Sequence, residues 1–323
     1  MKSRPAKETS STKTSYTLTL SEEQVEALGR WCDARCWSFY SVPYARFAFR
    51  GDQVNVVAYG SGKVVIQGKK TETFVTYVLE AEITKTPQLG YEEIQHPEWF
   101  QPHAGMDESG KGDFFGPLVV ACVVADGVMV RHWLSHHLKE SKKVASDGAV
   151  LKLDKLVRGT KGVVVQTAFA GMSKYNELYR KFGNLNELLS WFHAKALEGA
   201  LKRKAVSWGL LDQFARRASV SKYFKAEGFV LRQRQKAEDD PIVAAASIVA
   251  RAEYLRALRD LRQKSGIELP KGAGSKVKEQ GRKLLSSVGM DRLGEFAKLH
   301  FKTAHELGFS LDPKTGTLEN LTG

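Results

Sequence analysis

The sequence predicts a two-domain α/β (α+β) protein, in which a small sheet-and-helix domain precedes a larger domain with a mixed sheet flanked by helices. Two observations favour this fold class. Short strand-like runs follow one helix-like segment near the start of the chain, and in the larger part strands come before alternating helices and strands. The 323 residues suffice for one large core and a smaller companion domain.

The small domain is expected over residues 16–87, after a flexible tail at residues 1–15 that is rich in Lys, Ser and Thr. A helix fits residues 21–34, where Ser21 is a suitable N-cap. Strand-like runs separated by glycine-containing turns follow at residues 44–49, 54–59 and 63–68. The pattern is typical of a small antiparallel sheet beside a helix.

Residues 88–103 carry Pro97 and Pro102 with few periodic apolar positions, so a linker is expected there. The larger domain is expected over residues 104–310, before a tail at residues 311–323. Apolar runs predict its strands at residues 118–125, 162–170, 206–211 and 228–232. Two helices are predicted, one over residues 184–204 and a long one from Pro241, a favoured first-turn residue.

Lys and Arg outnumber Asp and Glu by 49 to 36, which gives a net charge of +13 and a pI near 9.5. This excess favours a polyanionic partner, with nucleic acid ahead of a membrane surface. No apolar run approaches the roughly 20 residues of a membrane span, and residues 1–16 lack the apolar segment of a signal peptide. With 3 cysteines, no disulfide framework is expected. We expect a cytoplasmic monomer that does not bind membranes.

The densest local pattern lies at residues 105–117, where Asp107 and Glu108 precede a glycine-rich turn and an apolar strand. Neighbouring residues of a strand point to opposite faces of the sheet. Only one of these two acids can therefore aim fully into a single site, and the other must reach a neighbouring position or act through its backbone.

The same residues satisfy the spacing of a phosphate-binding loop through Gly105, Gly110 and Lys111. Such a loop continues with Ser or Thr to hold magnesium, whereas this chain has Gly112. Acids inside the loop would also repel the phosphates that it cradles. A nucleotide hydrolase is therefore a weaker alternative, as is a purely structural turn.

Further acids stand at the ends of later elements. Asp212 ends the apolar run at residues 206–211, and Glu238, Asp239 and Asp240 directly precede the last long helix. Each group alone is commonly a helix cap or a dipole partner. A nuclease, however, needs several converging carboxylates as hard ligands for two divalent ions. Their joint occurrence in a basic chain favours a nuclease over a non-catalytic nucleic-acid-binding protein, because acids beside a phosphate oppose affinity.

Residues 105–124, GMDESGKGDFFGPLVVACVV, resemble the signature of type 2 ribonucleases H, and within them of bacterial ribonuclease HIII. Residues 59–68, YGSGKVVIQG, resemble the substrate-binding domain of that family, which is similar in fold to the TATA-box-binding protein. Other segments resemble the family in the expected order, namely Glu140-Ser141-Lys142-Lys143, Asn184-Leu185-Asn186 with Trp191 and His193, Leu211-Asp212-Gln213-Phe214, Ala244-Ala245-Ala246-Ser247 with Arg251, Leu269-Pro270-Lys271-Gly272 and His300-Phe301-Lys302-Thr303.

The resemblance implies a ribonuclease H-like catalytic domain preceded by a TATA-box-binding-protein-like domain. It implies an endonuclease that cuts the RNA strand of RNA–DNA hybrids, leaves 5′-phosphomonoesters and uses two Mg²⁺ or Mn²⁺ ions. The catalytic and metal-binding quartet carries over as Asp107, Glu108, Asp212 and Glu238. Because the connection from Glu238 to the alanines is shorter than in the family, Asp239 is the fallback for the fourth position and Asp240 a third choice.

The resemblance also implies substrate contacts in both domains. In the larger domain, the Gly-Lys-Gly turn would read the ribose 2′-hydroxyl, and hydroxyl or basic side chains would meet phosphates. These residues are Ser109, Gly110, Lys111, Gly112, Ser141, Lys142, Lys143 and Lys271. In the small domain the candidates are Tyr59, Lys63 and Gln67. His193 is expected to be structural.

Overall fold

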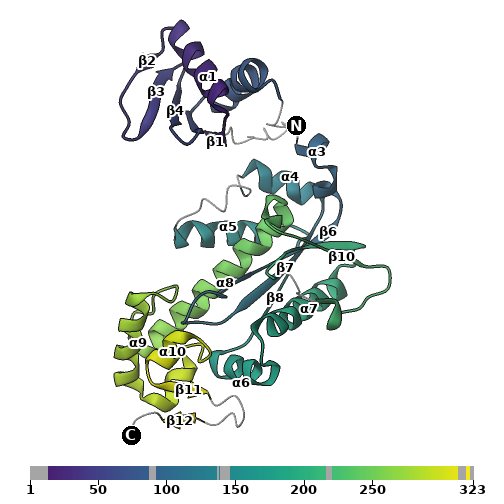
Figure 1. Cartoon of the computed structure of the whole chain (residues 1–323). Coiled ribbons are helices and arrows are strands. Elements are labelled where there is room, and N and C mark those ends of the chain that lie inside the picture. Colours follow the sequence, from purple (N-terminus) through teal and green to yellow (C-terminus); the bar gives the residue numbers. More distant parts are fainter. Residues whose placement is uncertain are drawn as a thin grey trace, which may run out of the picture. The chain divides into compact units, whose positions relative to one another are not determined.

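The computed structural model of the chain describes residues 14–86, 92–136, 138, 146–215, 220–311 and 318–320. It divides into two compact units, Met1–Glu98 and Trp99–Gly323, which are described separately below (Figure 1). No described helix combines the length and the apolar composition that a membrane span needs.

The first unit contains one antiparallel sheet with the strand order β1-β5-β4-β3-β2. Its strands are β1 (Ser15–Thr19), β2 (Ser38–Phe39), β3 (Ala45–Gly51), β4 (Val54–Tyr59) and β5 (Lys63–Gly68). Helix α1 (Glu22–Ala34) begins with a capping box between Ser21 and Gln24. A short α2 (Thr71–Phe74) continues directly as η1 (Val75–Thr84), a helix of the π type.

One face of this sheet packs against the helices. Along β5, Val64 and Ile66 are fully buried in a core that also contains Leu28 and Leu79, whereas Lys63 and Gln67 are exposed. Because side chains alternate along a strand, Lys63 and Gln67 lie on the face opposite the helices. That face is therefore the one at which the predicted substrate residues of this unit reach solvent.

The second unit is built on a mixed sheet with the strand order β10-β9-β6-β7-β8. Its strands are β6 (His103–Ser109), β7 (Val119–Ala125), β8 (Val164–Phe169), β9 (Trp208–Asp212) and β10 (Val230–Arg234). Strands β7 and β8 run antiparallel to their neighbours, while β6, β9 and β10 are mutually parallel. The predicted mixed sheet is confirmed.

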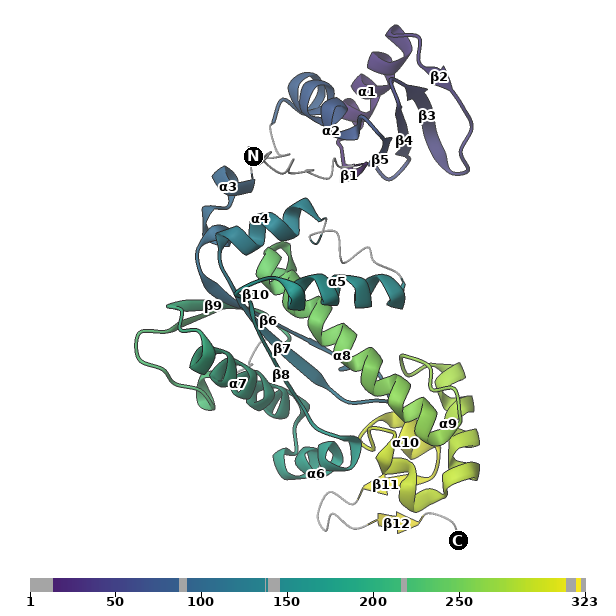
Figure 2. The ribbon, with the colours of Figure 1, turned by 180° about the vertical axis from the view of Figure 1, so that it is seen from behind.

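Helices cover both faces of this sheet (Figure 2). Residues of β7 at odd positions, including Val119 and Val123, share a core with α8 (Pro241–Ser265). Those at even positions, including Val120 and Val124, share a second core with α7 (Leu185–Arg203). Burial on both faces explains why β7 is apolar throughout.

The remaining described helices, of which α3 belongs to the first unit, come before, between and after these elements along the chain. They are α3 (Glu92–Gln95), η2 (Pro97–Phe100), α4 (Gly127–Ser135), α5 (Asp147–Gly159), α6 (Met172–Phe182), η4 (Val220–Lys222), η5 (Ala237–Asp239), α9 (Ser275–Val288), η6 (Met290–Glu295) and α10 (Lys302–Glu306). Helix α8 begins at Pro241 and α7 directly after Asn184, whose side chain accepts two backbone N–H groups. Both helix starts agree with the prediction from the sequence.

The structure differs from the expected linker and tails at three points. The linker at residues 88–103 contains α3 and η2, and Trp99 is only 2% exposed because it packs as part of the second unit. Strand β1 begins at Ser15, inside the expected N-terminal tail. In the expected C-terminal tail, β12 (Leu318–Asn320) pairs with β11 (Phe309–Leu311). Residues 1–13, 87–91, 312–317 and 321–323 lie outside the described part of the chain.

Candidate active site

Asp107 and Glu108 leave β6 toward opposite faces of the sheet. Asp107 accepts a hydrogen bond from the Ser247 hydroxyl of α8. Glu108 is directed toward α7, where its Oε2 lies 3.2 Å from His193 Nε2. The Glu108 backbone N–H donates to Asp107 Oδ1 at 2.7 Å. Each of the two adjacent acids is therefore contacted by a different helix, Asp107 by α8 and Glu108 by α7.

Asp212 ends β9, the strand parallel and adjacent to β6. The register pairs Met106 with Leu211, which brings Asp212 alongside Asp107. Asp212 Oδ1 accepts the backbone N–H of Ala237 at 2.8 Å, and a hydrogen bond joins the carboxyl groups of Asp212 and Glu238. A carboxylate can only accept, so this bond requires one proton between the two groups.

Burial and the charges of neighbouring acids raise the pKa values of Asp107 and Asp212. Burial raises the pKa of Asp107 to about 8, and the charges of Glu108 and Asp212 add to this, against hydrogen bonds from Ser247 and the Glu108 N–H. The pKa of Asp212 is raised by burial and by the neighbouring Glu238 and Glu108. The raised pKa values of Asp107 and Asp212 show that the acids of this region lie close enough to repel one another.

The donor set fits a hard divalent cation, because carboxylate oxygens are the ligands that Mg²⁺ and Mn²⁺ prefer. The side-chain orientations do not yet form such a site. Among the described residues, no three His, Cys, Asp or Glu side chains are arranged as metal ligands. Asp107, Glu108 and Asp212 each accept a hydrogen bond from the protein donors named above, and the remaining lone pairs of each carboxylate are available to an ion.

The other two acids of the 238–240 cluster are directed elsewhere. Asp239 accepts from Arg234 Nη1 at 2.7 Å at the surface. Asp240 is fully buried, caps α8 and lies 3.1 Å from His103 Nε2. Of the three acids, Glu238 is the one that hydrogen-bonds to Asp212.

The glycine turn after β6 requires glycine at its first position. Gly110 has a φ of 85°, and a Cβ there would lie 2.2 Å from the Pro117 carbonyl oxygen and 2.9 Å from the Tyr254 ring. Gly112 is different, because a Cβ there would meet nothing within 4 Å. The turn is therefore tightly packed at Gly110 and open at Gly112.

A buried lysine and a buried tyrosine hydrogen-bond to the backbone that directly follows this turn. Lys298 is fully buried, and its Nζ donates to the carbonyl oxygens of Asp113, at 2.7 Å, and Gly116. The Tyr254 hydroxyl donates to the Phe115 carbonyl at 3.1 Å. Burial lowers the pKa of Lys298 to about 7. These contacts fix the backbone between Asp113 and Gly116.

The predicted substrate residues of this unit lie at different places. Lys111 Nζ donates to the Phe214 carbonyl at 2.8 Å, just beyond Asp212. Lys271 pairs with Asp147 at 2.7 Å, and the Gly272 N–H after it donates to Asp113 at 2.6 Å, so its loop touches the glycine turn. Ser109 ends β6. Ser141, Lys142 and Lys143 lie outside the described residues.

Sequence reasoning did not assign roles to Ser247, Tyr254 or Lys298. Ser247 stands in a segment that the resemblance did identify, but nothing local relates its hydroxyl to Asp107. Lys298 offered one signal, since it follows two apolar residues and precedes a third in Phe296-Ala297-Lys298-Leu299. A lysine within an apolar run is a candidate for a buried group with a specific partner.

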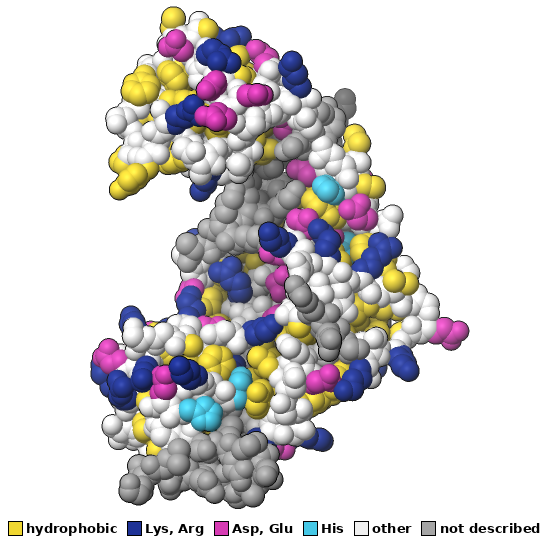
Figure 3. Space-filling view, viewed as in Figure 1, with side chains coloured by type: hydrophobic (Ala, Val, Ile, Leu, Met, Phe, Trp, Pro, Cys, Tyr) yellow, Lys and Arg dark blue, Asp and Glu magenta, His cyan; other side chains and the backbone are white. Residues whose placement is uncertain are grey.

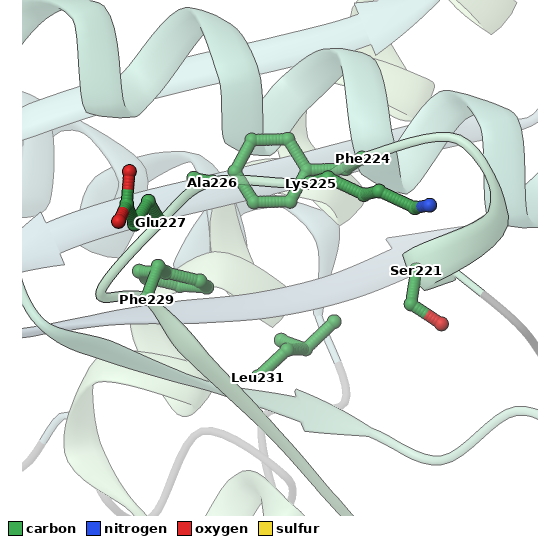
Figure 4. Close-up of a pocket in the computed structure, with 7 residues that line it drawn as sticks. All are labelled: Ser221, Phe224, Lys225, Ala226, Glu227, Phe229 and Leu231. Carbon is green, nitrogen blue, oxygen red and sulfur yellow. The ribbon is translucent and has the colours of Figure 1, made fainter.

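A cavity of about 440 Å³ lies between η4 and the edge strand β10 (Figure 4). Phe224, Phe229 and Leu231 give it apolar walls, and Lys225 and Glu227 extend in opposite directions around it. It contains none of the predicted site residues. The carboxylate cluster, not this cavity, is the candidate active site.

Comparison with known proteins relates the chain to one family of nucleases. The family model of ribonuclease HII matches residues 104–304, and that of a domain of unknown function (DUF3378) matches residues 19–88. Ribonuclease HIII of Chlamydia caviae is 38% identical over 269 residues, which cover 82% of this chain and 87% of that protein. Ribonuclease HIII of Chlamydia pneumoniae is 37% identical over 267 residues, or 81% of this chain and 87% of the relative.

The structure is also similar to that of Bst-RNase HIII in complex with Mn²⁺, with a TM-score of 0.62 and 26% identity. The similarity covers 91% of this chain and 98% of the other. The ribonuclease H-like fold predicted for the larger domain is confirmed. On its sequence and its fold, this chain belongs to the ribonuclease HIII family and is a ribonuclease H.

Proposed function

We propose that this chain is an endoribonuclease that hydrolyses the RNA strand of RNA–DNA hybrids at the carboxylate cluster of Asp107, Glu108, Asp212 and Glu238. Family membership supports the activity. The observation that carries the assignment of residues is that acids from β6, β9 and η5 meet in one region, where burial and then the charges of Glu108 and Asp212 raise the pKa of Asp107.

The four carboxylates would hold two divalent ions, Mg²⁺ or Mn²⁺. When bound, such ions activate a water and stabilise the leaving oxygen of the scissile phosphate. Attack of water on phosphorus with loss of the 3′ oxygen leaves a 5′-phosphomonoester. The chain itself orients two of the carboxylates, through Ser247 for Asp107 and the Ala237 N–H for Asp212.

Substrate recognition is proposed at the glycine turn and at basic groups around it. The open position at Gly112 allows close approach of a ribose, and a 2′-hydroxyl distinguishes RNA from DNA. Lys and Arg side chains gather over α9 in the view of Figure 3, and this helix carries Lys276, Arg282 and Lys283. Together with Lys271, they supply positive charge for phosphates.

In the first unit, Tyr59, Lys63 and Gln67 are the proposed contacts with the hybrid. Lys63 and Gln67 lie on the sheet face opposite the helices, where a nucleic-acid backbone can approach. Further proposed phosphate contacts in the second unit are Ser141, Lys142 and Lys143. A cytoplasmic location and a monomeric state remain predictions from the sequence.

The two rival functions fit less well. A protein that only binds nucleic acid gains nothing from four acids placed together. The nucleotide hydrolase fails on geometry, because residues 105–109 lie inside β6 and do not form a phosphate loop. A Cβ at Gly105 would lie 2.5 Å from the backbone of Ile242, so this glycine serves the close packing of α8 on the strand.

The direct test is cleavage of a labelled RNA–DNA hybrid beside all-DNA and all-RNA duplexes, each with Mg²⁺ or Mn²⁺ and with a chelator. The proposal predicts cuts in the RNA strand of the hybrid alone, and none with chelator. Cleavage that persists in chelator, or that is equal for the all-DNA duplex, contradicts it.

A further inference from the structure

We propose that His193 is a positioning residue, which fixes Glu108 in the carboxylate cluster by donating its Nε2–H to the Glu108 carboxylate. The inference rests on the proposed function, because it concerns the same acids. His193 of α7 would orient Glu108 by a hydrogen bond, as Ser247 of α8 does for Asp107.

The need for such a residue follows from strand geometry. Asp107 and Glu108 are neighbours on β6, so their side chains leave on opposite faces. Asp107 is directed to α8 and its Ser247, whereas Glu108 is directed to the α7 side. A glutamate has three side-chain torsions and loses much rotamer entropy when it is fixed. Without a partner on the α7 side, Glu108 would populate orientations away from the other acids.

His193 has the properties of a fixed donor. Its side chain is 0% exposed, and its Nε2 lies 3.2 Å from Glu108 Oε2, while Glu108 is 11% exposed. Within the described part of the chain, Nδ1 has no hydrogen-bond partner. A carboxylate is an acceptor, so the proton belongs on Nε2 and Nδ1 is left as a bare lone pair. The ring therefore offers one donor, directed at Glu108.

The orientation of the ring is set by stacking. Phe214 lies parallel to the His193 ring, with centroids 5.1 Å apart and an interplanar angle of 5°. The Phe214 carbonyl accepts Lys111 Nζ at 2.8 Å, and the same ammonium lies 5.3 Å from the Phe214 ring. The His193 ring thus connects α7, Glu108 and, through Phe214, the lysine of the glycine turn.

The test compares His193→Gln with His193→Asn in the full chain. Glutamine places its amide N–H₂ near the position of Nε2 and can donate to Glu108, whereas asparagine has the same chemistry but is one methylene too short. Phe192→Leu is the control for general damage, because Phe192 is a neighbouring α7 residue that is 3% exposed and packs in the same core. Folding of each variant is checked by circular dichroism.

Two quantities are measured, Mn²⁺ affinity by calorimetry without substrate, and kcat and KM on a hybrid. Loss of an outer contact to a metal ligand typically lowers metal affinity or activity by about 10- to 100-fold. We expect a loss of this size in Mn²⁺ affinity and kcat for His193→Asn, with KM unchanged within about twofold. His193→Gln should recover most of the lost Mn²⁺ affinity and kcat. Phe192→Leu should lower Tm and leave Mn²⁺ affinity and kcat unchanged.

The proposal is overturned if His193→Asn binds Mn²⁺ and turns over like the unaltered chain, if glutamine fails as badly as asparagine, or if Phe192→Leu weakens Mn²⁺ binding equally. Failure of the proposed function would look different. In that case the unaltered chain would cut no hybrid, while calorimetry with Mn²⁺ would still decide whether His193 positions Glu108.

Discussion

At the scale of single residues, the burial of Asp107 beside other acids lowers the free energy of unfolding of the metal-free protein, by an amount that depends on pH. Its pKa is about 8 in the folded chain against an ordinary value of 3.8, because the carboxyl is buried beside other acids. The folded state therefore holds a proton that the unfolded state releases. Stability of the metal-free protein must decline as pH rises from about 4 to about 8.

Asp107→Asn should remove this contribution, since asparagine resembles the protonated acid. In chelator, the Tm values of the variant and the unaltered chain should be closest near pH 4 and below, where Asp107 stays largely protonated in the unfolded chain too, and should move apart as pH rises. At pH 9 the variant should melt at least about 3 °C higher, the shift that ~1 kcal/mol produces in a domain of this size. Thermal melts across the pH range check this, and a Tm difference that does not change with pH contradicts it.

Replacement of each of the three acids at residues 238–240 should have a different effect on activity and stability. Glu238→Gln should lower kcat by about 100-fold or more, because a metal ligand contributes several kcal/mol. Asp239→Asn should change activity by less than about twofold, since it loses a surface pair with Arg234.

Asp240→Asn should lower stability by about 1 kcal/mol or more, because the residue caps α8 and contacts the buried His103. Steady-state kinetics and urea titrations on the three variants measure these effects. An inactive Asp239→Asn beside an active Glu238→Gln would move the fourth catalytic position to Asp239.

At the scale of elements, the glycine turn offers a matched pair of substitutions. Gly110→Ala introduces a side chain at a φ of 85° against the Pro117 carbonyl, so stability should fall by about 2 kcal/mol. Gly112→Ala enters open space and should leave stability unchanged within about 0.5 kcal/mol.

If Gly112 meets the hybrid, its alanine variant should instead raise KM. Chemical denaturation gives the first comparison and kinetics the second. Equal stability of the two variants would show that the turn is not constrained at Gly110 as the structure describes.

The elements that could be predicted from the sequence are those with local signals. Asn184 and Pro241 mark helix starts through capping and backbone chemistry within one turn of the chain. The helical stretch of α2 and η1 was not predicted, because Thr71, Val75 and Ile83 are β-branched and favour strands. Packing against α1 overrides that propensity, and β1 depends on its long-range pairing with β5.

The candidate site likewise has one part that the sequence predicts and another part that depends on long-range packing. The acids stand in a recognisable order, so Asp107, Glu108, Asp212 and Glu238 could be proposed from the sequence. The donors that orient them could not, because they come from distant parts of the chain. His193 is 85 residues from Glu108, and Lys298, which supports the backbone after the glycine turn, is 185 residues from Asp113. Such contacts follow from the packing of α7 and the C-terminal segment.

At the scale of the whole molecule, we propose that the first unit supplies affinity for the hybrid and the second unit the chemistry. Lys63→Ala should raise KM for hybrid and leave kcat unchanged, since it removes binding that is uniform along the reaction. The slope of log affinity against log salt should become shallower by about 1.

Arg30→Ala is the charge-matched control, because Arg30 is exposed on α1, on the helical side of the same unit. Affinity for a hybrid is measured against salt for the three chains. Equal slopes for Lys63→Ala and the unaltered chain would show that this sheet face does not meet phosphates.

The central claim is that the carboxylate cluster cuts the RNA strand with the help of divalent metal. The most direct measurement is the single-turnover rate of hybrid cleavage by Asp107→Asn in Mg²⁺ or Mn²⁺, beside its hybrid affinity. Cleavage should fall by about 100-fold or more while affinity is retained within about threefold, because a metal ligand is lost and no phosphate contact. Metal-dependent cleavage at the rate of the unaltered chain would place the chemistry elsewhere.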